Sequence, residues 1–276
     1  MKNYLLLLFA MANFAMAACA EKDYIVVIHT PHGEMEAILY DETPKHKENF
    51  IKLVKSGQYD GTIFHRVINN FMIQAGDINA KPGNKDSVNY TIPAEFDKRF
   101  FHHKGALAAA RQSDNLNPTQ ASSGSQFYIV QGMVVPKEQL TIDMPKVNMY
   151  FGRLVQEEAY KYIKDTLSNA YRSGGNRLYM QKVIEYIPLL EEKYDMSFKI
   201  DYPEERLEVY TSIGGTPHLD DTYTVFGKII NGLEVIDKIA ALPTGVGDKP
   251  VDDIEITISL KSMEKELWLE KFGTQP

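Results

Sequence analysis

The sequence has a single cysteine, Cys19, among its 276 residues, which excludes a disulfide within the chain. Cysteine and histidine pairs at the spacing of metal ligands are also missing. His102 and His103 are adjacent, and neighbouring side chains of an extended segment point to opposite sides. No nucleophile motif of a hydrolase is visible either. The sequence therefore predicts neither a metal nor another cofactor.

Basic residues are in the minority, with 30 Lys and Arg against 37 Asp and Glu and a formal net charge of −7. Removing residues 1–18, whose only charge is Lys2, makes the chain more acidic still. Basic side chains form no cluster, so a nucleic-acid surface is not expected. The hydrophobic content of 44% and aromatic content of 11% are ordinary for a globular core.

No apolar run is long enough to cross a bilayer, which takes about 20 residues. The chain begins MKNYLLLLFAMANFAMAAC, with one early basic residue, a short apolar run and small residues at its end. This pattern is typical of a secretory signal. We therefore expect residues 1–18 to be a signal peptide and residues 19–276 to form the exported protein.

Cys19 follows Met16-Ala17-Ala18, which is similar to a bacterial lipoprotein box, although Ala15-Met16-Ala17 also fits ordinary signal cleavage. A lone thiol is unusual in an oxidising compartment, and this favours lipid attachment at Cys19. A thiol left near a cleavage site by chance is the alternative. We expect an exported protein of a bacterial envelope, lipid-anchored in the periplasm or at the outer membrane. It would touch a membrane only through Cys19.

Residues 64–77, FHRVINNFMIQAGD, form the window most typical of a functional site. Arg66 lies among apolar, strand-forming residues, where a guanidinium is retained only if an acceptor needs it. Alternation predicts that Phe64 and Arg66 share one face of a strand and that Met72 and Gln74 share a face of the next. An arginine that merely extends to solvent from a hairpin is the simpler alternative.

Three later stretches occur in a fixed order: GALAAAR at 105–111, SGSQFYIVQG at 123–132 and YTVFGKIINGLEVIDKI at 223–239. Together with the FHR and FM-Q-GD motifs of the first window, they resemble the cyclophilin-type peptidyl-prolyl isomerases. The one visible departure is Ala75, where the family usually has glycine. The resemblance covers residues 24–133 and 217–261.

The resemblance implies a mainly β fold, a closed eight-stranded antiparallel barrel with two capping helices. Side chains fill the interior of such a barrel, so the site is expected on its outside. Residues 134–216 interrupt the pattern and are predicted to be a mainly helical insertion within the isomerase domain.

Within the insertion, apolar spacing from Phe151 to Tyr171 predicts one helix that ends at Gly174-Gly175. A second helix is expected from Arg177 to Leu190, and Pro203 can open a third. The segment is rich in tyrosine, which combines apolar area with a polar tip. Two interpretations stay open: an insert that packs on itself and stabilises the protein, or a binding surface.

The resemblance implies cis/trans isomerisation of X-Pro bonds in unfolded or exported proteins, with proline-containing segments as partners. Arg66 is the expected catalytic residue, because a fixed cation can stabilise the proline nitrogen when amide resonance is lost. The expected substrate-binding residues are Phe71, Met72, Gln74, Ala110, Gln126, Tyr128, Leu219 and Tyr223. The rival function is a non-catalytic peptide-binding or chaperone module that uses the tyrosine-rich insertion.

Three positions differ from the best-known eukaryotic members of the family that the chain resembles. Tyr128 stands in place of Phe, Tyr223 in place of His, and His218, before Leu219, in place of Trp. The last difference argues against tight binding of cyclosporin but not against turnover.

Overall fold

The computed structural model describes residues 22–81, 83 and 87–272. The expected signal peptide and Cys19 lie outside this part, and their assignments stay predictions. The chain forms two compact units, one from residues up to 132 together with those from 216 onward, and one from residues 133–215. We call them the sheet unit and the helical unit.

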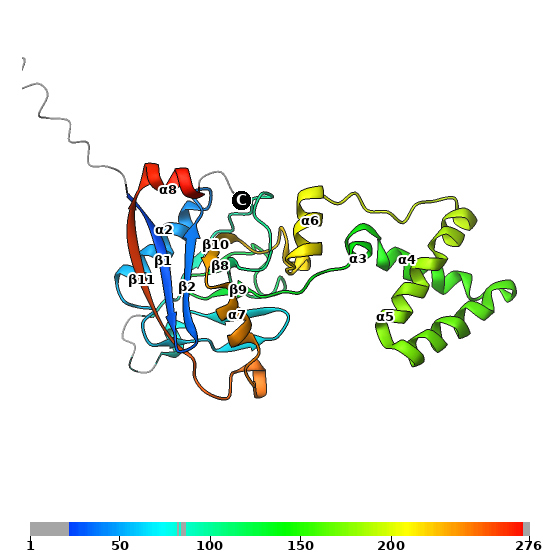
Figure 1. Ribbon diagram of the computed structural model, residues 1–276, viewed down its shortest axis with the longest axis horizontal. Helices are drawn as coiled ribbons and strands as arrows, with labels where there is room; N and C mark the ends of the chain where they lie inside the picture. The colour runs from blue at the N-terminus through cyan, green and yellow to red at the C-terminus, as the bar shows by residue number, and fades with distance from the viewer. Residues whose placement is uncertain (1–21, 82, 84–86, 273–276) are drawn as a thin grey trace, which may run out of the picture. The chain divides into compact units, whose positions relative to one another are not determined.

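The sheet unit is built on a nine-stranded sheet in which every recorded pairing is antiparallel. Its order is β3-β11-β1-β2-β10-β7-β9-β5-β4, and β11, β1 and β2 can be followed side by side in Figure 1. The strands are β1 (Lys22–Thr30), β2 (Gly33–Leu39), β3 (Thr62–Ile63), β4 (Arg66–Ile68), β5 (Met72–Ala75), β7 (Ala106–Ala109), β9 (Phe127–Val130), β10 (Val225–Asn231) and β11 (Glu255–Glu264). A separate pair joins β6 (Thr91–Ile92) to β8 (Ser122–Ser123).

The two end strands of the sheet, β3 and β4, are consecutive in the chain and separated only by Phe64 and His65. The Phe64 N–H donates to the Ile254 carbonyl at 3.0 Å, and the His65 N–H donates to the Gln74 carbonyl at 3.1 Å. The chain thus leaves one edge of the curled sheet and joins the other within two residues. Among the described strands no ladder pairs β3 with β4, so the expected closed eight-stranded barrel is not confirmed.

Alternation along the strands gives the sheet two different faces. One face carries the main apolar core, in which Val67, Ile73, Leu107 and Ile129 are each at most 1% exposed. The other face carries a second cluster that includes Met72, Ala108, Ala110, Tyr128 and Val130. We call these the core face and the site face.

Two helices bury their apolar sides in the main core. Helix α2 (Pro44–Lys55) contributes Phe50, Leu53 and Val54, and α7 (Leu233–Ala240) contributes Val235, Ile236 and Ile239. In α2 these residues are spaced i, i+3, i+4, and in α7 they are spaced i, i+1, i+4. Either spacing places the side chains in one apolar stripe along the helix. Both helices therefore cover the core face of the sheet, whereas the pocket around Arg66 lies on the site face.

The helical unit contains α3 (Lys137–Thr141), α4 (Met144–Leu154), α5 (Lys161–Tyr194) and α6 (Glu204–Ser212). The single helix expected from Phe151 to Tyr171 is wrong: α4 ends at Leu154, and a short 3₁₀ turn, Glu158–Tyr160, precedes α5. Glu157 is extended, which breaks the helix although the apolar period continues across it. None of the helices in the described ranges is both long and apolar enough to cross a bilayer.

Helix α5 is interrupted at Gly174 and Gly175, where the backbone leaves helical geometry, as the sequence predicted. Gly175 has φ +61, and a Cβ at Gly174 would lie 2.7 Å from Leu178 Cβ. Only glycine accepts this left-handed angle and close approach without strain. The two halves, 161–173 and 176–194, pack with α4 around the core of the helical unit.

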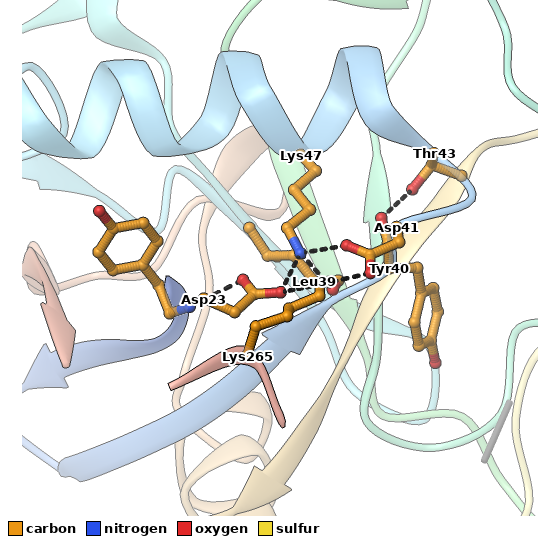
Figure 2. A network of polar contacts seen from close by, with 8 residues as sticks. Asp23, Leu39, Tyr40, Asp41, Thr43, Lys47 and Lys265 are labelled. Carbon is orange, nitrogen blue, oxygen red and sulfur yellow. Dashed lines mark hydrogen bonds and ion pairs between the residues drawn. The ribbon is translucent and has the colours of Figure 1, made fainter. Parts of the chain in front are cut away.

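A polar network joins the start of β1 to helix α2 and to the C-terminal helix α8 (Lys265–Phe272) (Figure 2). Asp23, whose side chain is 4% exposed, accepts from Lys47 Nζ and Lys265 Nζ, both at 2.6 Å. Both lysines also contact Asp41, and each stands over the Trp268 ring. Burial tends to raise the pKa of Asp41, but hydrogen bonds from Lys265 and Lys47 outweigh it and lower that pKa.

Asp23→Asn removes the charge that the two lysines share while keeping the shape of the side chain. Because this carboxylate is buried, we expect the free energy of unfolding to fall by about 2–4 kcal/mol, measured by urea denaturation at pH 7. Asp252→Asn, at an exposed position, is the control and should change little. Equal stabilities of the two variants would contradict a structural role for the network.

Candidate active site

A pocket of about 240 Å³ opens on the site face of the sheet unit. It is lined by Arg66, Phe71, Met72, Gln74, Ala110, Arg111, Tyr128, Leu219 and Tyr223. The fold therefore brings the expected catalytic residue together with all the expected binding residues except Gln126. Arg111 was not among the expected residues, although the GALAAAR motif contains it.

Strand register explains how residues that are far apart in the sequence meet in this pocket. Arg66 in β4 pairs with Gln74 in β5, Gln74 pairs with Tyr128 in β9, and Tyr128 pairs with Ala108 in β7. Directly opposed residues in a sheet point to the same face. Four strands thus present one transverse row that carries a cation, an amide, a phenol and a methyl group.

The predicted placement of Phe64 on the same face as Arg66 is wrong. Phe64 is fully buried in the main core, whereas Arg66 lines the pocket on the opposite face. The strand is interrupted between these two residues, where the hydrogen bonds change from the β11 side to the β5 side. The aromatic wall of the pocket comes instead from Phe71, which follows the Asn-Asn turn.

The Arg66 side chain is 42% exposed, and its Nε lies 3.5 Å from Asp248 Oδ2. Asp248 is also partly exposed, at 48%, and pairs of this kind contribute roughly 0–1 kcal/mol. The guanidinium is thus held loosely at the pocket rim, and most of its hydrogen-bonding capacity can be turned to a ligand. Asp248, 182 residues away in the sequence, carried no signal that could have linked it to Arg66.

Gln74 donates from its side-chain amide to Gln126 Oε1 at 3.0 Å. Gln126 lines a neighbouring pocket of about 430 Å³, which shares Gln74, Ala110 and Arg111 with the first. The two cavities therefore adjoin, and Gln126 stands beside the first pocket rather than within it. An extended peptide that filled both would pass the paired amides.

Tyr128 at the base of the pocket is anchored by its hydroxyl. The hydroxyl lies 2.9 Å from His102 Nε2, and His102 Nδ1 lies 2.9 Å from Asp220 Oδ1. The His102 ring therefore bridges the Tyr128 hydroxyl and the Asp220 carboxylate. Burial raises the pKa of Tyr128 well above its usual value, so the phenol stays protonated. His102 thus connects Tyr128, at the base of the pocket, to Asp220, which follows Leu219 in the chain.

Two aromatic contacts fix the outer walls of the pocket. The Arg111 guanidinium lies 4.3 Å from the centroid of the Tyr223 ring, and its Nε donates to the Thr222 carbonyl at 2.8 Å. The His218 ring stacks on Phe71, with centroids 5.5 Å apart. In the described part of the chain, no group of three or more His, Cys, Asp or Glu side chains could hold a metal ion.

Comparison with known proteins gives a family match over most of the chain. The family model "Cyclophilin type peptidyl-prolyl cis-trans isomerase/CLD" matches residues 25–182 and 204–259. A peptidyl-prolyl cis-trans isomerase of Staphylococcus epidermidis is 33% identical over 233 residues, which cover 84% of this chain and 88% of that protein. The match therefore includes part of the helical unit.

A bifunctional phosphatase/peptidyl-prolyl cis-trans isomerase of Streptococcus pyogenes is 32% identical over 235 residues. The chain spans 37% of the length of that larger relative. Among solved structures, a cyclophilin-type isomerase of Cryptosporidium parvum matches with a TM-score of 0.50 and 21% identity, covering 86% of this chain and 97% of that one. At this identity the structural likeness speaks for the fold alone.

The family model and the sequence relatives name the same family. This chain accordingly belongs to the cyclophilin-type peptidyl-prolyl cis-trans isomerases and has their isomerase activity.

Proposed function

We propose that the pocket around Arg66 binds the proline of an X-Pro segment and that Arg66 is the catalytic residue. The observation that carries this proposal is the transverse row of Arg66, Gln74 and Tyr128, which sets a guanidinium at the rim of an apolar pocket. A solved structure of the related Cryptosporidium parvum isomerase was obtained in the presence of the dipeptide Ala-Pro. A proline dipeptide used with that protein supports the proposal of a proline-binding pocket.

Rotation about an X-Pro bond needs no bond to break. Resonance of the C–N bond sets a barrier of about 18–20 kcal/mol, and the twisted state leaves a lone pair on the proline nitrogen. A guanidinium can donate a hydrogen bond to that lone pair but not to the planar amide, so it stabilises the transition state selectively. Because arginine stays charged at any ordinary pH, the donor is always available.

The other residues of the pocket grip the peptide on both sides of the bond. Phe71, Met72 and Leu219 enclose a proline ring without offering it hydrogen bonds. Gln74 and Gln126 can hold the backbone groups that flank the proline, since their paired side-chain amides retain one acceptor and one donor group. The peptide is thus fixed while one bond turns.

The energetic share of Arg66 follows from the strength of one charge-assisted hydrogen bond. Such a bond is worth about 1.5–3 kcal/mol, which corresponds to roughly a tenfold to hundredfold rate increase. The remaining acceleration would come from ordering the peptide and from excluding water at the apolar wall. Loss of the guanidinium should therefore weaken the activity strongly without reducing the binding of proline to the same extent.

We also propose that the protein acts on exported clients from the bacterial envelope, with a lipid anchor at Cys19. The N-terminal sequence supports this proposal through its short apolar run and the lone cysteine after Met16-Ala17-Ala18. Proline-containing segments of newly exported chains would then be the substrates.

Arg66→Ala should fold normally, because this side chain is partly exposed, and should lower kcat/KM on a short X-Pro peptide by about tenfold to a hundredfold. Arg66→Lys keeps the charge but loses the planar fork, and should also lose most of the activity. A protease-coupled isomerisation assay measures both variants, with Arg99→Ala as the control at an exposed arginine. An unchanged rate in Arg66→Ala would refute the catalytic assignment.

Tyr128→Phe keeps the aromatic ring but leaves the buried Nε2 atom of His102 without its partner. We expect the free energy of unfolding to fall by about 1–3 kcal/mol, while most of the isomerase activity is retained. Tyr223→Phe removes a hydroxyl that has no recorded hydrogen bond in the described residues, and it should leave stability unchanged. A loss of activity in Tyr128→Phe without a loss of stability would instead place the hydroxyl in the reaction.

Cys19→Ala tests the anchor in a bacterial host that exports the protein. The unaltered protein should sediment with membranes and carry the added mass of a lipid, whereas Cys19→Ala should appear in the soluble fraction without that mass. Fractionation and mass spectrometry of the intact protein give the two measurements. The same mass and distribution for both proteins would rule out lipidation at this residue.

A further inference from the structure

The helical unit contains a groove of about 770 Å³ between α4 and the two halves of α5, elements that are labelled in Figure 1. Phe151 and Leu167 form its largely buried floor, and Tyr171 and Tyr179 meet edge to face at 6.3 Å beside it. Tyr171 remains 59% exposed. The volume is in the range of about 300–1,000 Å³ that is usual for ligand sites.

The charged side chains that line this groove have one sign. Lys164 and Arg172 are the only charged side chains among the described residues that line it. Other lysines of the helical unit are paired with carboxylates, as in Lys161 with Glu158, Lys182 with Glu185 and Lys193 with Glu157. Within the described residues, no ion pair or side-chain hydrogen bond is recorded for Lys164 or Arg172.

Gly152 gives the groove additional room. It lies near the end of α4, where a glycine costs up to about 1 kcal/mol relative to alanine. A Cβ placed on Gly152 would meet no atom within 4 Å, so no contact inside the protein requires a glycine here. The missing side chain instead leaves space in the groove beside Phe151.

From these features we propose that the groove binds a short peptide segment that has apolar side chains between two carboxylates. Lys164 and Arg172 are eight residues apart on one helix, a rise of about 12 Å. An extended peptide covers that distance in about four residues. The carboxylates at both ends of such a segment pair with the two cations, while its apolar side chains cover Leu167 and the two tyrosines.

A peptide with two carboxylates can pair with both cations of the groove. A fatty acid has a single carboxylate and can pair with only one of them. A nucleic-acid strand would bring a phosphate at every nucleotide to a unit that offers only two unpaired cations in the groove. The groove is distinct from the prolyl site, because no residue that lines the groove also lines the pocket around Arg66.

Binding is tested by fluorescence anisotropy with the full chain and a dye-labelled peptide, Asp-Leu-Phe-Ala-Glu, which contains no proline. We expect saturable binding that weakens with salt, and at least tenfold weaker binding of the matched amide peptide, Asn-Leu-Phe-Ala-Gln. Equal binding of the two peptides would overturn the proposal. Displacement of the acidic peptide by laurate or by an oligothymidylate that binds more tightly would also overturn it in favour of that ligand.

Two changes in the groove should each weaken binding of the acidic peptide at least tenfold. Gly152→Leu fills the space from within, and Asn169→Leu, at an exposed site outside the groove, is its control. Lys164→Glu combined with Arg172→Glu reverses the charge, and Lys137→Glu combined with Lys199→Glu makes the same charge change elsewhere on the unit.

All four variants should keep the unaltered rate of isomerisation on a short X-Pro peptide and the unaltered thermal unfolding transition of the full chain. This readout separates failure of the groove from failure of the prolyl site. Tight binding of the acidic peptide to Gly152→Leu and to the charge-reversed variant would show that it binds elsewhere, and the proposal would be wrong.

Discussion

The register between strands β4, β5, β9 and β7 is the constraint on which the site depends. On the core face, Val67, Ile73, Ile129 and Leu107 stand opposite one another and are excluded from water. Burying each such side chain stabilises the fold by about 1.5–3 kcal/mol. A slip of one residue in any of these strands would expose that row and turn the polar row inward, so the apolar core fixes the direction of Arg66.

The site face then becomes a pocket because its residues differ in size. Ala108 and Ala110 are small, so the sheet surface is hollow between Phe71 and Tyr223. Tyr128 would be a costly group to bury at the base of this hollow if its hydroxyl were unpaired. The contact with His102, itself held by Asp220, removes that cost and keeps the ring in place.

The two units of the chain have separate cores and offer separate binding surfaces. The sheet unit has the pocket around Arg66, whereas the helical unit has a larger groove lined by two cations, Lys164 and Arg172. The sequence left open whether the insertion packs on itself or binds other chains. The structure gives it a core of its own and, beside that core, exposed tyrosine and cations, so the two interpretations do not exclude each other.

Motifs in the sequence named eight of the nine residues that line the pocket, because the family resemblance assigned each motif to the site; they missed Arg111 and added Gln126, which lines the neighbouring pocket. The periodic spacing of residues was by itself a less reliable guide to strand faces and helix ends. It placed Phe64 beside Arg66, but the strand breaks between them, and it joined α4 to α5 although Glu157 is extended. Local apolar spacing does not record where hydrogen-bonding partners change.

The sequence by itself determined the chemistry of the site: a permanent cation, two amides and an apolar wall, carried on strands in a known order. Only the tertiary structure decided that the curled sheet stays open, that His102 joins Tyr128 to Asp220, and that Lys164 and Arg172 flank a groove. These features depend on contacts between residues far apart in the chain. Such contacts follow from how the cores pack, and packing leaves no periodic pattern along the sequence.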